Sequence, residues 1–179
     1  AIESIVQPDV RAGRLDMSIT ASMRESRVFG PNLVLRRTIT STLGEPSLKI
    51  HDVVTNEGNV TTPHMFLYHC NFGYPLVDEG VDIVCKGTWT SRGLDMDNAI
   101  FSDKRNYRKC SGPLDSHRGT GEGCAFIDAT PDKEGICTVG LANQKINLAL
   151  VMKYSKKQFP WVSNWQHWGP GEYVTALEP

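Results

Sequence analysis

The sequence lacks an excess of charge of either sign, a long apolar run and a recognisable leader. A formal net charge of -1 over 179 residues provides no basic field for nucleic acid and no polybasic segment for a membrane surface. No apolar run approaches the ~20 residues of a transmembrane helix. The first residues lack the basic and apolar regions of a secretory signal. We therefore expect neither nucleic acid nor a membrane as a partner.

Metal-binding patterns are missing as well. The five cysteines are Cys70, Cys85, Cys110, Cys124 and Cys137. None of them forms a Cys-x-x-Cys pair, which argues against a zinc ribbon. No His-x-His pair occurs, which argues against a cupin-like metal isomerase. A site that combines Cys70 with His69 is a weak alternative. Because disulfides are rare in the cytoplasm, we expect most of the cysteines to be reduced core residues of a cytoplasmic protein.

Helix signals are scarce, and the patterns that are present favour β-strands. No segment of useful length combines caps with a period of 3.6 residues. Segments 33–39 and 48–55 alternate with period two instead. One face of the first segment carries Leu33, Leu35, Arg37 and Ile39, and one face of the second carries Leu48, Ile50, Asp52 and Val54.

Further strands are expected over residues 81–89, three times within 123–154, and over 172–179. Many short strands with Gly and Pro turns indicate a large antiparallel sandwich. The polar, irregular segment 92–123 is long for a connection inside a compact domain. Such a segment is often functional, although a mobile surface crossover explains it equally well.

The segment FLYHCNFGYPLVDEG, residues 66–80, adds polar groups to an apolar strand pattern. A strand over residues 65–72 places His69 and Asn71 on one face, and apolar or aromatic residues on the other. The Gly-Tyr-Pro sequence that follows ends the strand. A strand that leaves the core for a pocket has this pattern. A buried histidine that is hydrogen-bonded to a neighbour has it too, and both interpretations stay open.

The tail, residues 153–179, contains Trp161, Trp165 and Trp168 among Gln, Asn, His, Gly and Pro residues. This mixture suits a pocket wall where rings stack on a sugar and polar groups meet its hydroxyls. Core packing explains the three tryptophans as well. In the final strand, Glu178 follows two small apolar residues on its face. Partial burial there would raise its pKa and make it a general base, whereas the alternative is an exposed glutamate at a chain end.

The motifs LYHCNFGYPLVDEG and QFPWVSNWQHWGPGEYVTALEP resemble the aldose 1-epimerase-like proteins, which have a galactose mutarotase-type β-supersandwich. The resemblance runs from about Gly30 to Pro179, and the closest branch is a bacterial group of unknown function. It implies that His69 is the acid and that Glu178 is the general base. The sugar-binding residues that it implies are Asn71, Phe72, Gln158, Trp165 and Tyr173.

Members of that family have an N-terminal sheet region that adds another His or Arg to the pocket, and they continue with further strands beyond the base. We therefore expect an all-β, antiparallel supersandwich that is incomplete at both ends. It would form one domain over residues 1–179 of a longer chain. The order of Asn71 and Phe72 is also reversed, because the aromatic residue comes first in well-characterised mutarotases.

The resemblance implies an enzyme that interconverts sugar anomers by acid-base ring opening. Glu178 would take a proton from the anomeric hydroxyl while protonated His69 gives one to the ring oxygen, without a metal or cofactor. Positioned acid and base groups of this kind typically raise a reaction rate ~10²–10⁴-fold. The expected partner is a monosaccharide or sugar derivative, and the sequence leaves the sugar and the oligomeric state open. The alternative is a non-catalytic carbohydrate-binding β-sandwich. What distinguishes the two is whether His69 and Glu178 meet.

Overall fold

The structure is a computed structural model of the chain, and it describes residues 1–101 and 107–179. Strands make up 51% of the residues and helices 7%. Every strand pair that the structure describes is antiparallel, so the predicted all-β antiparallel class is confirmed. The chain forms two compact units, Ala1–Met65 and Phe66–Pro179. The single domain expected over residues 1–179 stays a prediction.

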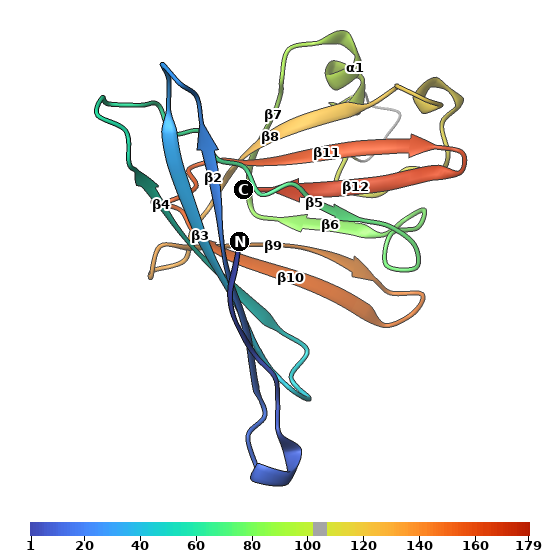
Figure 1. Ribbon diagram of the computed structural model, residues 1–179. Coiled ribbons are helices and arrows are strands. Elements are labelled where there is room, and N and C mark those ends of the chain that lie inside the picture. Colours follow the sequence, from blue (N-terminus) through green and yellow to red (C-terminus); the bar gives the residue numbers. More distant parts are fainter. Residues whose placement is uncertain (102–106) are drawn as a thin grey trace. The chain divides into compact units, whose positions relative to one another are not determined.

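The first unit is a four-stranded antiparallel meander (Figure 1). Its strands are β1 (Ile2–Val6), β2 (Asp16–Ser26), β3 (Asn32–Thr42) and β4 (Leu48–Asn56), with a short 3-10 turn, η1 (Val10–Ala12), between β1 and β2. Both segments with period-two alternation fall inside these strands, 33–39 in β3 and 48–55 in β4, as predicted.

A cross-strand ion pair explains the two charged residues on otherwise apolar strand faces. The register places Arg37 of β3 directly opposite Asp52 of β4. Arg37 donates two hydrogen bonds to the carboxylate, from Nε at 2.9 Å and from Nη2 at 2.7 Å. This bidentate geometry satisfies a carboxylate whose side chain is largely buried.

The second unit contains two antiparallel sheets, which form separate layers in Figure 1. The larger has the order β5-β12-β11-β8-β7 and the smaller the order β10-β9-β6. The strands are β5 (Cys70–Phe72), β6 (Asp82–Cys85), β7 (Gly87–Ser91), β8 (Gly123–Ala129), β9 (Ile136–Asn143), β10 (Leu148–Ser155), β11 (Val162–Gly169) and β12 (Glu172–Glu178). Among the described residues between β7 and β8 there are three short helices, α1 (Asp95–Asn98), η2 (Ala99–Phe101) and η3 (Asp115–His117).

Buried side chains from both sheets form the core of the second unit. The smaller sheet contributes Ile83, Cys137, Val139 and Leu141, and the larger contributes Ile127, Val162, Trp168 and Leu177. These residues alternate along their strands with residues that point away, because successive side chains of a strand face opposite sides. The three strands predicted within 123–154 are confirmed as β8, β9 and β10.

The cysteines are free, as expected, and four of the five are buried. Burial raises the pKa of Cys85 to about 11, of Cys110 to about 12 and of Cys124 to about 11. These three thiols therefore stay protonated at neutral pH, and a protonated, buried thiol is a poor nucleophile and a poor metal ligand.

The strand predicted over residues 65–72 is wrong in length, because β5 covers only Cys70–Phe72. β5 lies at the edge of its sheet and pairs with β12 alone, and β12 ends at Glu178. The residues before Cys70 lie outside this ladder. One further backbone hydrogen bond lies beyond the end of the β5–β12 ladder: the Tyr68 N–H donates to the Pro179 carbonyl at 3.0 Å. The predicted strand end before Gly73 is confirmed.

The single strand predicted over residues 81–89 is also corrected, because the chain changes sheets there. β6 belongs to the three-stranded sheet and β7 to the five-stranded sheet, and only Lys86 separates them. Gly87 makes the transition with φ +146°. A Cβ atom on Gly87 would lie 2.2 Å from the Asp128 carbonyl oxygen. The position therefore requires glycine for both its conformation and its close approach to β8.

Replacing Gly87 with alanine is expected to destabilise the protein by about 2 kcal/mol, because the Cβ atom adds a backbone clash to an unfavourable φ. Urea unfolding measures the change. Gly80→Ala is the matched control: Gly80 has φ +82°, but its Cβ would meet nothing within 4 Å. Equal losses in both variants would contradict the close approach at Gly87.

Two further parts of the sequence were incompletely predicted. The expectation for segment 92–123 covers residues 102–106, which lie outside the described residues. Its described parts contain the three short helices rather than a fully irregular connection. The strand β11 was not predicted at all, although its sequence VSNWQHWG alternates between a buried face and a second, mostly polar face. Tryptophan, asparagine and glutamine on the buried face hid this alternation.

Candidate functional site

One face of the five-stranded sheet carries several of the predicted site residues. Trp165 of β11 lies opposite Ala176 of β12, which lies opposite Asn71 of β5. Directly paired residues share a face, so these three lie on the same side of the sheet as Glu178. The opposite face points into the core, and its buried residues include Asn164, Gln166, Trp168 and Leu177.

His69 and Glu178 meet on this face. The last ladder pair of β5 and β12 joins Cys70 to Leu177, and one further step in register pairs His69 with Glu178. His69 Nε2 lies 3.0 Å from Glu178 Oε1. The His69 side chain is 52% exposed, whereas the Glu178 side chain is only 7% exposed. A buried carboxylate is thus paired with an imidazole that solvent and ligands can reach.

The environment of Glu178 disfavours its charged form. Burial raises the pKa of Glu178 above its ordinary value of 4.5, protonated His69 offsets part of this change, and the negative Glu122 raises the pKa further. The folded protein therefore holds this proton more tightly than the unfolded chain does. The contribution of Glu178 to stability is present at low pH and is lost as the pH rises from about 4.5 through the raised pKa.

One oxygen of Glu178 has no hydrogen-bond donor. Oε1 is buried and accepts no hydrogen bond from the residues that the structure describes, although His69 Nε2 lies 3.0 Å from it. A buried polar atom without a partner is unfavourable by about 1–3 kcal/mol.

Trp165 connects the pair to other polar groups. Its ring centroid lies 5.9 Å from that of His69, in an edge arrangement. On the same strand face, the His167 ring stacks parallel to the indole with centroids 5.7 Å apart and a 6° angle between planes. The indole Nε1–H donates to Glu122 Oε2 at 2.5 Å. Trp165 is therefore held from two sides and presents an edge contact to His69.

A charged network behind Trp165 was not predicted from the sequence. Arg92 Nη2 donates to Glu122 Oε1 at 2.8 Å, and Arg92 also donates twice to Asp97, at 2.8 and 3.1 Å. Asp97 is fully buried and accepts a further hydrogen bond from the Cys124 backbone N–H at 2.7 Å. These three charged residues lie in or beside the long segment 92–123, and the only available signal was that such segments are often functional.

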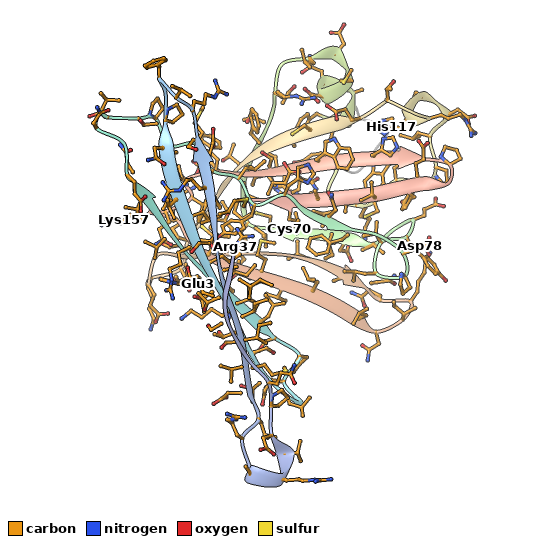
Figure 2. All side chains as sticks on the ribbon, viewed as in Figure 1. Glu3, Arg37, Cys70, Asp78, His117 and Lys157 are labelled. Atoms are coloured by element: carbon orange, nitrogen blue, oxygen red, sulfur yellow. The ribbon has the colours of Figure 1, made fainter. Side chains whose placement is uncertain are left out.

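A second His–Glu pair lies at the other end of the same face. His167 Nδ1 lies 2.6 Å from the Gly121 carbonyl oxygen and so acts as a donor, while Nε2 lies 3.3 Å from Glu172 Oε2. Figure 2 shows His117 beside the ends of β8 and β11, where its Nδ1 accepts the Trp168 backbone N–H at 3.0 Å. The Glu172 carboxylate also accepts the Gly119 N–H at 2.8 Å, so all of these polar groups serve local structure.

The structure brings some of the predicted sugar-binding residues to this face and not others. Trp165 is there, and Asn71 is exposed on it. Phe72 packs against the core on the other side. Tyr173 does so too, and its hydroxyl donates to the Ser111 carbonyl. Gln158 is exposed in the turn after β10, where its backbone N–H donates to the Ser155 carbonyl at 3.1 Å. The sugar-binding roles expected of Phe72, Tyr173 and Gln158 stay predictions.

The residues that the structure describes contain neither a metal-binding cluster nor a helix that could span a membrane. In residues 1–101 and 107–179, no group of three or more His, Cys, Asp or Glu side chains is arranged to hold a metal ion. Within these same ranges, no helix has the length and apolar character needed to cross a membrane.

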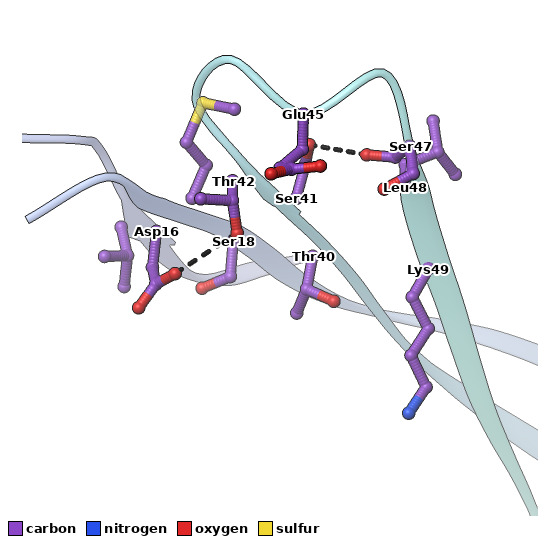
Figure 3. A pocket seen from close by; sticks show the side chains of 11 residues that line it. Asp16, Ser18, Thr40, Ser41, Thr42, Glu45, Ser47, Leu48 and Lys49 are labelled. Atoms are coloured by element: carbon purple, nitrogen blue, oxygen red, sulfur yellow. Dashed lines mark hydrogen bonds between the residues drawn. The ribbon is translucent and has the colours of Figure 1, made fainter.

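The first unit has a hollow of its own, with a volume of about 520 Å³ (Figure 3). It lies over the ends of β2, β3 and β4, and its polar lining includes Asp16, Thr42, Glu45 and Lys49. Thr42 donates to Asp16 at 3.3 Å across this lining. No histidine lines the hollow and no buried carboxylate faces it, so it offers no acid-base pair comparable to His69 and Glu178.

The family profile described as "Domain of unknown function (DUF4432)" matches residues 3–179. Among solved structures, a "putative aldose 1-epimerase" from Klebsiella pneumoniae subsp. pneumoniae MGH 78578 is similar, with a TM-score of 0.82 at 20% sequence identity. The match covers 92% of this chain and 42% of that one, so the chain spans less than half the length of this relative. The predicted aldose 1-epimerase-like sandwich fold is thereby confirmed. No curated protein matches the chain.

Proposed function

The chain belongs to the family described as a domain of unknown function (DUF4432), and we propose that it binds a monosaccharide or sugar derivative and interconverts its anomers. The observation that carries this proposal is the 3.0 Å contact between His69 and Glu178. The Glu178 carboxylate is buried, its pKa is raised, and one of its oxygens lacks a hydrogen-bond donor among the described residues. Perturbed, incompletely satisfied carboxyl groups of this kind are concentrated at functional sites.

Acid-base ring opening uses the two residues together. The Glu178 carboxylate takes the proton of the anomeric hydroxyl, protonated His69 gives its proton to the ring oxygen, and the bond between the anomeric carbon and the ring oxygen breaks. The bond between C1 and C2 of the resulting aldehyde then rotates, and the ring closes on the other face of the carbonyl carbon. During closure neutral His69 takes back a proton and protonated Glu178 gives one to the carbonyl oxygen. Both residues return to their starting states, so the cycle needs no cofactor.

The short distance between the two groups suits this substrate chemistry. The anomeric hydroxyl oxygen and the ring oxygen are bonded to the same carbon atom, so the base and the acid that serve them must be neighbours. Trp165 lies beside the pair and offers an aromatic surface on which the apolar face of a sugar can stack. Asn71, exposed on the same face, offers hydrogen bonds to sugar hydroxyls.

Replacing His69 with asparagine is expected to slow anomer exchange about 10²-fold or more, because asparagine is polar but cannot deliver a proton as an acid. Sugar binding should survive, since the Trp165 and Asn71 side chains remain. Exchange spectroscopy by NMR on a panel of aldoses measures the rate, and changes in chemical shift measure binding. The full-length protein is used, because the chain covers only part of its structural relative.

His51→Asn is the matched control, because His51 is an exposed histidine on β4 of the other unit. It should exchange anomers at the rate of the unmodified protein. If His69→Asn keeps that rate as well, the acid lies elsewhere. If the unmodified protein binds aldoses without accelerating their exchange, the chain is a carbohydrate-binding β-sandwich, the alternative function.

A further inference from the structure

We propose that Glu122 is a positioning residue, which holds the Trp165 indole beside His69 and places a fixed negative charge near the Glu178 carboxyl. The inference rests on the proposed function for its effect on rate. Its structural part, the orientation of Trp165 and the electrostatic environment of Glu178, can be measured without any activity.

The two oxygens of Glu122 have different partners. Oε2 accepts the Trp165 indole N–H at 2.5 Å, and Oε1 accepts the Arg92 guanidinium at 2.8 Å. A carboxylate that is held at both oxygens has one orientation, and the indole that it binds is then fixed as well. The His167 ring stacks on the indole, so Trp165 is restrained by the hydrogen bond at its edge and by the stack on its face.

The hydrogen-bond network that holds Glu122 begins at a carboxylate buried in the core. Asp97 is 0% exposed, and its carboxylate binds both the Arg92 side chain and the Cys124 backbone N–H, which lies in β8. Asp97 therefore fixes the orientation of the Arg92 side chain, and Arg92 in turn fixes that of Glu122. Groups that position an active-site residue need rotamers that are locked by packing and by further hydrogen bonds, as these are.

Glu122 stays ionised in this setting. Hydrogen bonds from Arg92 first and from Trp165 second lower the pKa of Glu122. The titratable groups whose charges act on Glu178 are His69, in the segment before β5, and Glu122, directly before β8. Cys124 of β8 also lies within electrostatic range of Glu178 but remains a protonated thiol. Glu122 is thus the negative charge that opposes the ionisation of Glu178.

Glu122→Gln tests the electrostatic part. The amide oxygen of glutamine can still accept the indole N–H, but the negative charge is lost. Glu178 should therefore ionise more readily, and its titration midpoint should move to lower pH. Carbon-13 NMR of the Glu178 carboxyl measures this midpoint directly, and the acidic limb of the exchange rate should move in the same direction. A purely structural role for Glu122 would leave the midpoint in place.

Glu122→Ala tests the positioning part, because it also removes the acceptor of the indole N–H. We expect a roughly 10-fold lower exchange rate, since small misplacements near reacting groups have effects of this size or larger. The emission of Trp165, obtained as the difference between each protein and its Trp165→Phe counterpart, should change in Glu122→Ala and be retained in Glu122→Gln. Glu134→Gln is the matched control, because Glu134 is an exposed glutamate with only a 4.0 Å contact to Lys133.

An unchanged Glu178 midpoint in Glu122→Gln, or unchanged Trp165 emission in Glu122→Ala, would overturn the inference. Both measurements remain decisive if no aldose is turned over. In that case a shifted midpoint and altered emission would support the role of Glu122, while the proposed function itself would fail.

Discussion

Replacing Glu178 with glutamine is expected to slow anomer exchange by ~10²-fold or more while sugar binding survives. Glutamine keeps the size of the side chain but cannot take a proton from the anomeric hydroxyl. The loss should fall on kcat rather than on KM, because the base acts in the transition state. Exchange spectroscopy on the full-length protein gives the rate, and shift perturbation by the sugar gives the affinity.

Folding stability distinguishes this loss of chemistry from a loss of structure. Burial disfavours the charged form of Glu178, so a neutral glutamine should not lower the free energy of unfolding near neutral pH. The acidic limb of the pH-rate profile should also vanish from any residual activity. If Glu178→Gln retains the full exchange rate, another group is the base and the account of the site is wrong.

Replacing Asp97 with alanine is expected to lower the free energy of unfolding by about 3–5 kcal/mol, the usual result of breaking a buried ion pair. Asp97 is fully buried and accepts two hydrogen bonds from Arg92 and one from the Cys124 backbone. Its removal leaves the Cys124 N–H without its acceptor and weakens the restraint on Arg92. Urea unfolding, followed by circular dichroism, measures the change.

Asp115→Ala provides the comparison for an exposed ion pair. Asp115 contacts Arg118 at 3.1 Å, but its side chain is 90% exposed, so its removal should alter stability by less than about 1 kcal/mol. The large loss is thus expected only where the carboxylate is buried. Similar, small losses in both variants would contradict the structural role given to Asp97.

Much of the fold could be predicted from the period-two alternation of side chains along short segments. In the first unit, alternation placed Arg37 and Asp52 on apolar strand faces, and the structure pairs them across β3 and β4. Alternation along residues 172–178 likewise placed Glu178 on a face with small apolar residues. Such periodicity reports which side of a strand a residue occupies, because successive side chains point to opposite faces.

The remaining features depend on contacts between distant segments. The position of β5 depends on its register with β12, which pairs Cys70–Phe72 with Thr175–Leu177, and nothing within residues 65–72 records that register. The break between β6 and β7 depends on the approach of Gly87 to Asp128. The pairing of His69 with Glu178 was predicted through family resemblance, since no local pattern joins these residues. Glu122 was missed because its partners, Arg92 and Trp165, are far from it in sequence.

The most direct test of the acid-base pair is the pH dependence of anomer exchange, measured by NMR on the full-length protein with a panel of aldoses. If His69 and Glu178 act as proposed, at least one aldose should exchange its anomers faster with the protein than in buffer alone. The rate should rise with pH as Glu178 loses its proton, with a midpoint above the ordinary glutamate value of 4.5. Exchange at the buffer rate for every aldose at every pH would contradict this proposal.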